Sequence, residues 1–201
     1  MCSVIGYIGE YDKDVVERLM VNSRIRGLHS FGYAYYDESQ LMVSIHLSFD
    51  EFIDSINSVR PKMFIAHFRY STSGDYLVVE NNQPILHNNI CVAFNGVISQ
   101  KSKAEMEFEY GLCLPNENDG YVLISRIDDE EFLKRKFISY ALVGLDGGRM
   151  FALRNKNRPL YRGFHEAKLI YSSTKDILMR SGISSYEEVE PYKKEYHDAC
   201  N

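Results

Sequence analysis

The chain has 201 residues, 45% of them hydrophobic and 25% charged, which is the size and composition of one globular domain with a sizeable core. Its formal net charge of -5 leaves no basic stripe, so we expect neither nucleic acid nor an anionic membrane as a partner. The N-terminus has no secretion signal, and no run approaches the ~18 apolar residues of a spanning helix. We therefore expect one cytoplasmic domain over residues 1–201.

The first half of the chain alternates strand and helix patterns. Ser48 followed by Glu51 has the spacing of a capping box, and apolar residues then recur on one helical face until Pro61. The polar stretch 71–89 predicts a long loop without regular structure, a kind of loop that is usually functional. The predicted elements are a strand over 2–8, a helix over 13–26, strands over 31–36 and 41–47, a helix over 49–60, and strands over 63–68 and 90–94.

The second half is less regular, because the periodicity weakens after Gly96. Asp119 precedes an apolar run and predicts an acidic helix cap. Asp146-Gly147-Gly148 predicts a hairpin turn. Strands outnumber helices, so the pattern favours a layered α+β fold. The remaining predictions are a helix after 119, a charged helix over 128–136, strands over 138–145, 150–153 and 168–171, and a last helix opened by Ser173 and Asp176.

The four cysteines lie far apart, with no Cys-x-x-Cys pair and no histidine at metal-ligand spacing. The sequence therefore predicts no metal site and no cofactor. Cys91 lies in an apolar run and is expected to be buried and inert. A reducing compartment would keep Cys2 a free thiol.

Cys2 follows Met1, and its small side chain is compatible with removal of that methionine, which we expect. Removal would leave Cys2 with a free α-amine beside its own thiol. An α-amine titrates near ~7.7 to 8.0 and a thiol near ~8.5, so the neutral amine can take the thiol proton at about physiological pH. No separate histidine or aspartate is then needed. A cysteine in second position is a weak signal by itself, so the rest of the sequence must decide.

Six segments of the chain form an ordered set of motifs. The segments are C-S-V-I-G-Y-I-G from Cys2, R-G-L-H-S-F-G from Arg26 (similar to R-G-x-D-S-x-G), A-H-F-R-Y-S-T-S-G from Ala66 (similar to G-H-x-R-Y-x-T-x-G), N-Q-P from Asn82 (similar to N-x-Q-P), F-N-G-V-I from Phe94, and N-D-G-Y-V-L from Asn118 (similar to S-D-T-E-V-L). In the same order, they resemble the motifs of the class II, or N-terminal nucleophile, glutamine amidotransferase family. The resemblance covers most of the chain and implies a four-layer αββα sandwich, two antiparallel sheets between helices.

The resemblance implies a pocket for free glutamine. Arg69 would bind the α-carboxylate through its planar guanidinium, and Tyr70 and Thr72 would complete that part of the pocket. Asp119 would hold the α-ammonium group. These roles together predict an amino-acid substrate.

The resemblance also implies that Cys2 is the nucleophile and that Asn95 and Gly96 form the oxyanion hole and contact the substrate. Arg26, at the predicted end of a helix, is expected to give structural support. The activity implied is hydrolysis of glutamine to glutamate and ammonia through a Cys2 thioester. Because the chain ends about where the family's glutaminase module ends, we expect a separate synthase or transferase protein to accept the ammonia.

Each motif also has a plainer interpretation. Arg69 could be a surface ion-pair residue, Asp119 a helix cap, and Asn95-Gly96 an ordinary hairpin turn. Two alternatives for the whole chain stay open: an amidase of the same superfamily with another substrate, and a catalytically idle regulatory or binding module. The second is prompted by departures from the family's motifs at His29, Gly120, Tyr121 and Asn155.

Overall fold

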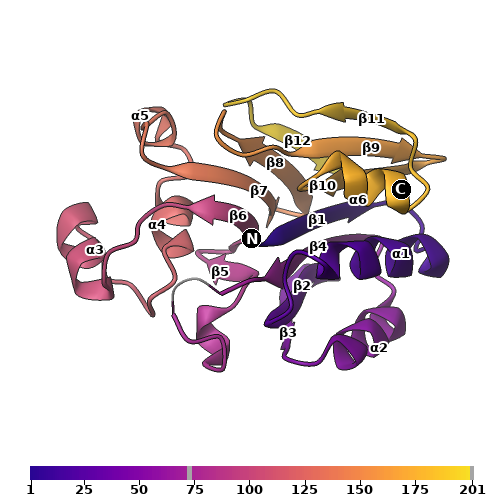
Figure 1. The fold of residues 1–201 in the computed structure, drawn as a ribbon, viewed down its shortest axis with the longest axis horizontal. Helices are drawn as coiled ribbons and strands as arrows, with labels where there is room; N and C mark the ends of the chain where they lie inside the picture. The colour runs from indigo at the N-terminus through magenta and orange to yellow at the C-terminus, as the bar shows by residue number, and fades with distance from the viewer. Residues whose placement is uncertain (72–73, 200–201) are drawn as a thin grey trace.

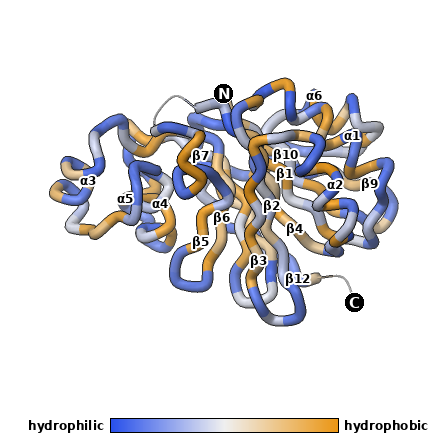
Figure 2. Tube along the Cα trace, turned by 90° about the horizontal axis from the view of Figure 1, so that it is seen from below, coloured by the Kyte–Doolittle hydropathy of each residue, from blue (hydrophilic) through white to orange (hydrophobic). Residues whose placement is uncertain are grey.

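The computed structural model describes residues 1–71 and 74–199. Two antiparallel β-sheets pack face to face, and helices cover the outer face of each sheet (Figure 1). The prediction of an αββα sandwich is confirmed. Figure 2 shows hydrophobic residues along the strands and hydrophilic residues at many of the turns.

The larger sheet contains the strand that follows Cys2. Its strands are Ser3–Ile8 (β1), Ser30–Asp37 (β2), Gln40–His46 (β3), Met63–Arg69 (β4), Tyr161–His165 (β9), Lys168–Ser172 (β10) and Ser185–Glu188 (β11). They are ordered β11-β9-β10-β1-β4-β2-β3. Since β1 pairs with β10 on one side and β4 on the other, the backbone next to Cys2 is fixed from both sides.

Three helices pack on the outer face of this sheet, namely Lys13–Arg24 (α1), Phe49–Val59 (α2) and Lys175–Arg180 (α6). Capping residues in the sequence determine where α1 and α2 begin. Asp12 accepts a hydrogen bond from the Val15 amide, and Ser48 accepts one from the Glu51 amide, as its spacing predicted. Ser173 does not open the last helix as expected, because its hydroxyl accepts from the Val4 amide at 2.8 Å instead.

The smaller sheet carries the other half of the sandwich. Its strands are Ile85–His87 (β5), Ile90–Val97 (β6), Ser139–Asp146 (β7), Arg149–Arg154 (β8) and Glu195–Asp198 (β12), and its helices are Lys103–Tyr110 (α3), Gly120–Ser125 (α4) and Glu130–Leu133 (α5). The strand order is β12-β8-β7-β6-β5. Gly147 and Gly148 have φ of 54° and 79°, the left-handed conformation that the predicted turn between β7 and β8 requires.

Alternate side chains of the strands face the space between the sheets. Val4 and Ile65 meet Ala93 and Val143 there in one buried cluster, which also contains Cys91. The prediction that Cys91 is buried is confirmed, and burial raises the pKa of its thiol. The small side chains Ala34, Ala93, Ala141 and Ala152 let the two sheets approach closely.

Two further predictions about local structure were wrong, and the helix α3 was not predicted. The stretch 71–89 is not a continuous loop, because it contains the 3-10 turn Val79–Asn81 (η1) and the strand β5. The weakly patterned region after Gly96 contains α3, which begins with a complete capping box between Ser102 and Glu105. The charged helix expected over 128–136 is only the single turn α5.

Candidate active site

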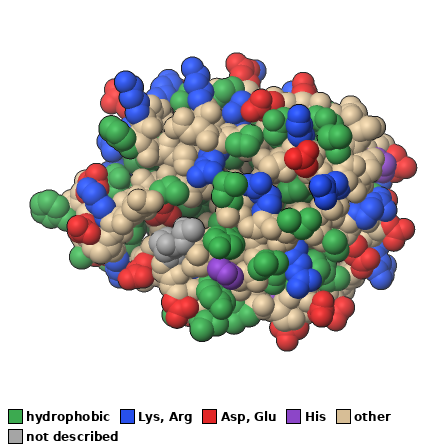
Figure 3. Space-filling view, viewed as in Figure 1, with side chains coloured by type: hydrophobic (Ala, Val, Ile, Leu, Met, Phe, Trp, Pro, Cys, Tyr) green, Lys and Arg blue, Asp and Glu red, His purple; other side chains and the backbone are tan. Residues whose placement is uncertain are grey.

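One pocket lies where the start of β1 meets the ends of β4 and β6. Five of the predicted site residues line it: Cys2, Arg69, Tyr70, Gly96, and Asp119 at the start of α4. These residues come from separate parts of the chain, and the two sheets bring them together. Figure 3 shows the face that contains the N-terminus, where hydrophobic and basic side chains gather near the centre. Thr72, also predicted to bind substrate, lies outside the described residues.

Cys2 lies directly before β1 and is half-buried. The Tyr70 amide lies 3.4 Å from its sulfur and the Tyr70 carbonyl oxygen lies 3.7 Å from it. Arg26 donates from Nε to the Cys2 carbonyl oxygen at 3.2 Å, which fixes the backbone of the cysteine. Burial raises the pKa of the Cys2 thiol, and the hydrogen bond with the Tyr70 backbone opposes that shift. The thiol is therefore mainly protonated near neutral pH and needs a base to become a nucleophile.

Arg69, the last residue of β4, is 7% exposed, so the interpretation as a surface ion-pair residue is wrong. Its Nη1 donates to the Asn81 carbonyl oxygen at 2.9 Å and to the Asn82 side-chain oxygen at 2.6 Å. Its Nη2 donates to the Gly74 carbonyl oxygen at 3.2 Å. The guanidinium thus joins β4 to the segment that forms one wall of the pocket.

Asn95 and Gly96 lie within β6 and pair with Ala141 and Tyr140 of β7, so the hairpin-turn interpretation is wrong. A Cβ atom on Gly96 would lie 1.9 Å from the Ser139 carbonyl oxygen. Glycine is therefore required by the neighbouring strand, not only by an approaching substrate as the sequence suggested. Gly96 lines the pocket. Asn95 is 3% exposed, and its side chain forms no hydrogen bond with another described residue.

Asp119 is the N-cap residue of α4, but its carboxylate forms no capping hydrogen bond there and bonds elsewhere. Its Oδ2 accepts from the Ile98 amide at 2.7 Å and from the Ser99 amide at 3.0 Å. Burial raises the pKa of this carboxyl group, and the two backbone donors act in the opposite direction. Although Asp119 and Arg69 line the same pocket, these two described residues form no ion pair with each other. One pocket therefore presents a positive and a negative group that are held apart.

Comparison with known proteins points to the same family as the sequence motifs. Glutamine–fructose-6-phosphate aminotransferase (isomerizing) of Bacillus subtilis is 26% identical to the chain over 195 residues, which cover 86% of this chain and 32% of that protein. Glutamine phosphoribosylpyrophosphate (PRPP) amidotransferase from B. subtilis has a TM-score of 0.75 at 20% identity, over 99% of this chain and 49% of its own. The resemblance to the class II glutamine amidotransferases is confirmed.

A class-II glutamine aminotransferase domain protein from Silicibacter pomeroyi matches along the full length of both chains, with a TM-score of 0.59 at 15% identity. The chain spans about a third of the length of the curated amidotransferase relatives that it matches. No family model matches the chain.

Two departures from the amidotransferase motifs have structural explanations. A Cβ atom on Gly120 would lie 2.3 Å from Ile85 and 2.5 Å from Phe94, so this glycine lets α4 pack closely on β5 and β6. The Asn155 side chain accepts from the Tyr140 amide and donates to the Ile138 carbonyl oxygen at 2.9 Å. Asn155 thus braces the start of β7, away from the pocket.

Sequence reasoning missed several polar residues of the pocket wall: Asn81, Gln83, Glu117 and Asn118. Asn118 donates to the Asn81 carbonyl oxygen at 3.0 Å, and the Gln83 side chain accepts from the Phe94 amide at 2.8 Å. The family-like N-Q-P segment was the available signal, but only its order in the chain was used. Over residues 1–71 and 74–199 no cluster of potential metal ligands occurs, and no helix is long and apolar enough to cross a membrane.

Proposed function

We propose that the protein hydrolyses the side-chain amide of glutamine, releasing ammonia and glutamate. The observation that carries this proposal is the pocket in which Cys2, Arg69, Gly96 and Asp119 converge from separate segments of the chain. A thiol, a cation and an anion in one pocket suit a zwitterionic amino acid whose side chain reaches the sulfur. The amidotransferase resemblance supports the same substrate.

In the proposed reaction, Met1 is first removed. Met1 is 64% exposed, which favours access by an aminopeptidase. The freed α-amine of Cys2 takes the thiol proton, and the thiolate attacks the amide carbon of glutamine. The carbonyl oxygen becomes an oxyanion that Asn95 and Gly96 stabilise. The protonated amine returns its proton to the leaving nitrogen, ammonia departs, and a γ-glutamyl thioester remains.

Water completes the cycle. The α-amine accepts a proton from the water as its oxygen attacks the thioester carbon, and the carbon–sulfur bond breaks. Glutamate leaves, and the proton held by the amine returns to the Cys2 sulfur. The raised pKa of the thiol supports this scheme, because a thiol that stays protonated near neutral pH needs a base within reach.

Arg69 and Asp119 would select for a free amino acid. We propose that the guanidinium binds the α-carboxylate and that the carboxylate of Asp119 binds the α-ammonium group, with Tyr70 and Thr72 completing the carboxylate pocket. The convergence of both groups on one pocket supports this selection. Another amide without these two charges would leave both groups desolvated and unmatched.

We further propose that the ammonia serves an amination carried out by a synthase or transferase. The relatives' names support this, since they describe an aminotransferase acting with fructose 6-phosphate and a phosphoribosylpyrophosphate amidotransferase. A reducing cytoplasm would keep Cys2 in its thiol form. The acceptor can be identified by cross-linking in the native host followed by mass spectrometry.

The test combines intact-mass measurement with a glutaminase assay. The expected mass lacks Met1, and Cys2→Ala is expected to abolish glutamate formation. Cys113→Ala is the matched control, because Cys113 is exposed and does not line the pocket. Undiminished turnover by Cys2→Ala would refute the mechanism. A glutamine analogue bearing an electrophile should label Cys2 faster than an uncharged amide bearing the same electrophile. Equal labelling rates for the two compounds would refute recognition of a free amino acid.

A further inference from the structure

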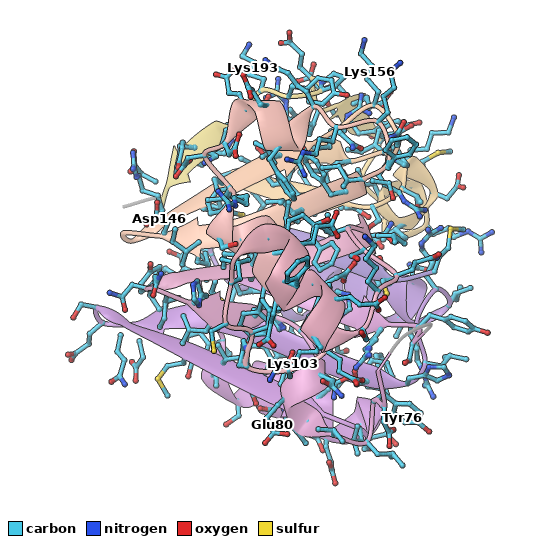
Figure 4. The ribbon with its side chains drawn as sticks, turned by 90° about the vertical axis from the view of Figure 1, so that its left-hand side faces the viewer. Tyr76, Glu80, Lys103, Asp146, Lys156 and Lys193 are labelled. Atoms are coloured by element: carbon cyan, nitrogen blue, oxygen red, sulfur yellow. The ribbon has the colours of Figure 1, made fainter. Side chains whose placement is uncertain are left out.

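His29, one of the departures from the family's motifs, is partly buried and contacts Tyr70 of the pocket wall. Its Nδ1 accepts a hydrogen bond from the Ser71 amide at 2.9 Å. Its ring stacks on Tyr70, with centroids 4.9 Å apart, and on Tyr76, with centroids 4.8 Å apart. Tyr76 lies at the outer edge of the molecule (Figure 4). The imidazole therefore contacts both ends of the segment that leaves β4 and lines the pocket.

The main chain of His29 also contacts the residues at the end of β4. Its amide donates to the Arg69 carbonyl oxygen at 3.0 Å, and the next residue, Ser30, pairs with Arg69 across β2 and β4. Three successive residues from Arg69 to Ser71 are thus held by His29. The middle one, Tyr70, is the residue whose amide lies 3.4 Å from the Cys2 sulfur.

We propose that His29 is a positioning residue that fixes the Tyr70–Ser71 backbone against the Cys2 thiol and so orders the pocket. The group that does this is an unprotonated side-chain acceptor at Nδ1, because only a lone pair can receive the Ser71 N–H. The two tyrosine rings add stacking contacts that hold the imidazole plane in place. Aspartate, which the family's segment has at this position, also presents an acceptor oxygen close to its backbone.

The proposal deepens the proposed function and relies on it for the catalytic readout, so its first test does not use glutamine. Amide hydrogen exchange of the 69–71 segment is measured in wild type, His29→Ala, His29→Asn and His29→Asp. Loss of one hydrogen bond is expected to speed exchange of the Ser71 amide about tenfold in His29→Ala. The Asn and Asp variants keep an acceptor and are expected to stay within about threefold of wild type.

The matched control is His87→Ala. His87 also contacts a tyrosine ring, that of Tyr121, but it does not line the pocket. Its replacement should leave exchange of the 69–71 segment unchanged. Unchanged exchange in His29→Ala would overturn the proposal, and equally fast exchange in His29→Asn and His29→Ala would overturn the role of the acceptor.

The second readout is glutamine kinetics. In His29→Ala we expect KM to rise about tenfold with a smaller fall in kcat, and partial rescue by His29→Asn, since the nucleophile itself is intact. Faster exchange with an unchanged KM would overturn the link to the pocket. A wild-type protein without glutaminase activity would instead refute the proposed function, while the exchange data alone would still decide whether His29 holds the segment.

Discussion

Replacing His67 with leucine is expected to make the free energy of unfolding less sensitive to acid pH. His67 lies on β4, opposite Val4 and Gly32, and is fully buried. Neither of its ring nitrogens has a hydrogen-bond partner among the described residues.

Burial, and then the positive charge of Arg69, lower the pKa of His67 to about 3, while the backbone of Phe94 acts in the opposite direction without offsetting them. An imidazole in the unfolded chain titrates near ~6.5. Between these values the unfolded chain binds a proton that the folded chain does not. Stability is therefore fully present above about pH 6.5, falls as the pH decreases, and levels off near the folded pKa of about 3.

The size of the effect follows from the gap between the two pKa values. Between the two pKa values, each unit decrease in pH lowers the free energy of unfolding by about 1.4 kcal/mol. Lowering the pH from 7 to 4.5 should therefore lower this free energy by about 3 kcal/mol through His67 alone. Leucine has a similar volume and does not titrate. It also removes two buried polar atoms without partners, so His67→Leu should be at least as stable as wild type at pH 7.

The assay is urea unfolding of wild type and His67→Leu at several pH values between 7 and 4.5. Other groups titrate in this range, so the informative quantity is the difference in unfolding free energy between the two proteins. That difference should grow by about 3 kcal/mol in favour of His67→Leu as the pH falls to 4.5. Parallel stability curves would refute the reasoning, because they would mean that His67 binds its proton equally in both states.

Three further predictions concern the pocket. Asn95→Ala should lower kcat by about 10² to 10³ with little change in KM, and an undiminished kcat in the glutaminase assay would exclude its oxyanion role. Gly96→Ala places a methyl group against the Ser139 carbonyl and should cost roughly 1–3 kcal/mol or more, so a melting temperature equal to wild type in calorimetry would contradict the packing argument. With Met1 in place, iodoacetamide should alkylate Cys2 more slowly than free cysteine at pH 7.5, and the alkylation rate should still increase above pH 9, because burial raises the thiol pKa. Peptide mass spectrometry measures the rate, and a plateau near pH 8.5 would argue against this.

Features set by neighbouring residues were predictable from the sequence. The strand beginning beside Cys2, the helix begun by Ser48, and the turn at Gly147-Gly148 depend on a few adjacent positions, and all three are confirmed. The strands β11 and β12 were not predicted, because their residues are largely polar and partly exposed and have no apolar alternation to detect. Their pairing depends on partners elsewhere in the chain.

In the candidate site, too, features set by adjacent residues were predictable and features set by distant partners were not. The sequence motifs named five residues that line the pocket, but they did not show what holds these residues in place. Asn95-Gly96 reads as a turn locally, and only pairing with β7, about 45 residues later, makes it a strand. Asp119 reads as a cap, and only the amides of Ile98 and Ser99, 21 and 20 residues earlier, redirect its carboxylate. Both interpretations failed where a distant partner competes with a local one.

The carbonyl oxygen of Asn81 connects the two charged sides of the pocket. It accepts from Arg69 at 2.9 Å and from the Asn118 side chain at 3.0 Å, and Asn118 directly precedes Asp119. The guanidinium of Arg69 and the carboxylate of Asp119, both described residues, attract each other across the pocket without forming an ion pair. Backbone and side-chain hydrogen bonds hold the guanidinium, and two backbone amides hold the carboxylate. The zwitterionic substrate that we propose would supply one opposite charge to each side of the pocket.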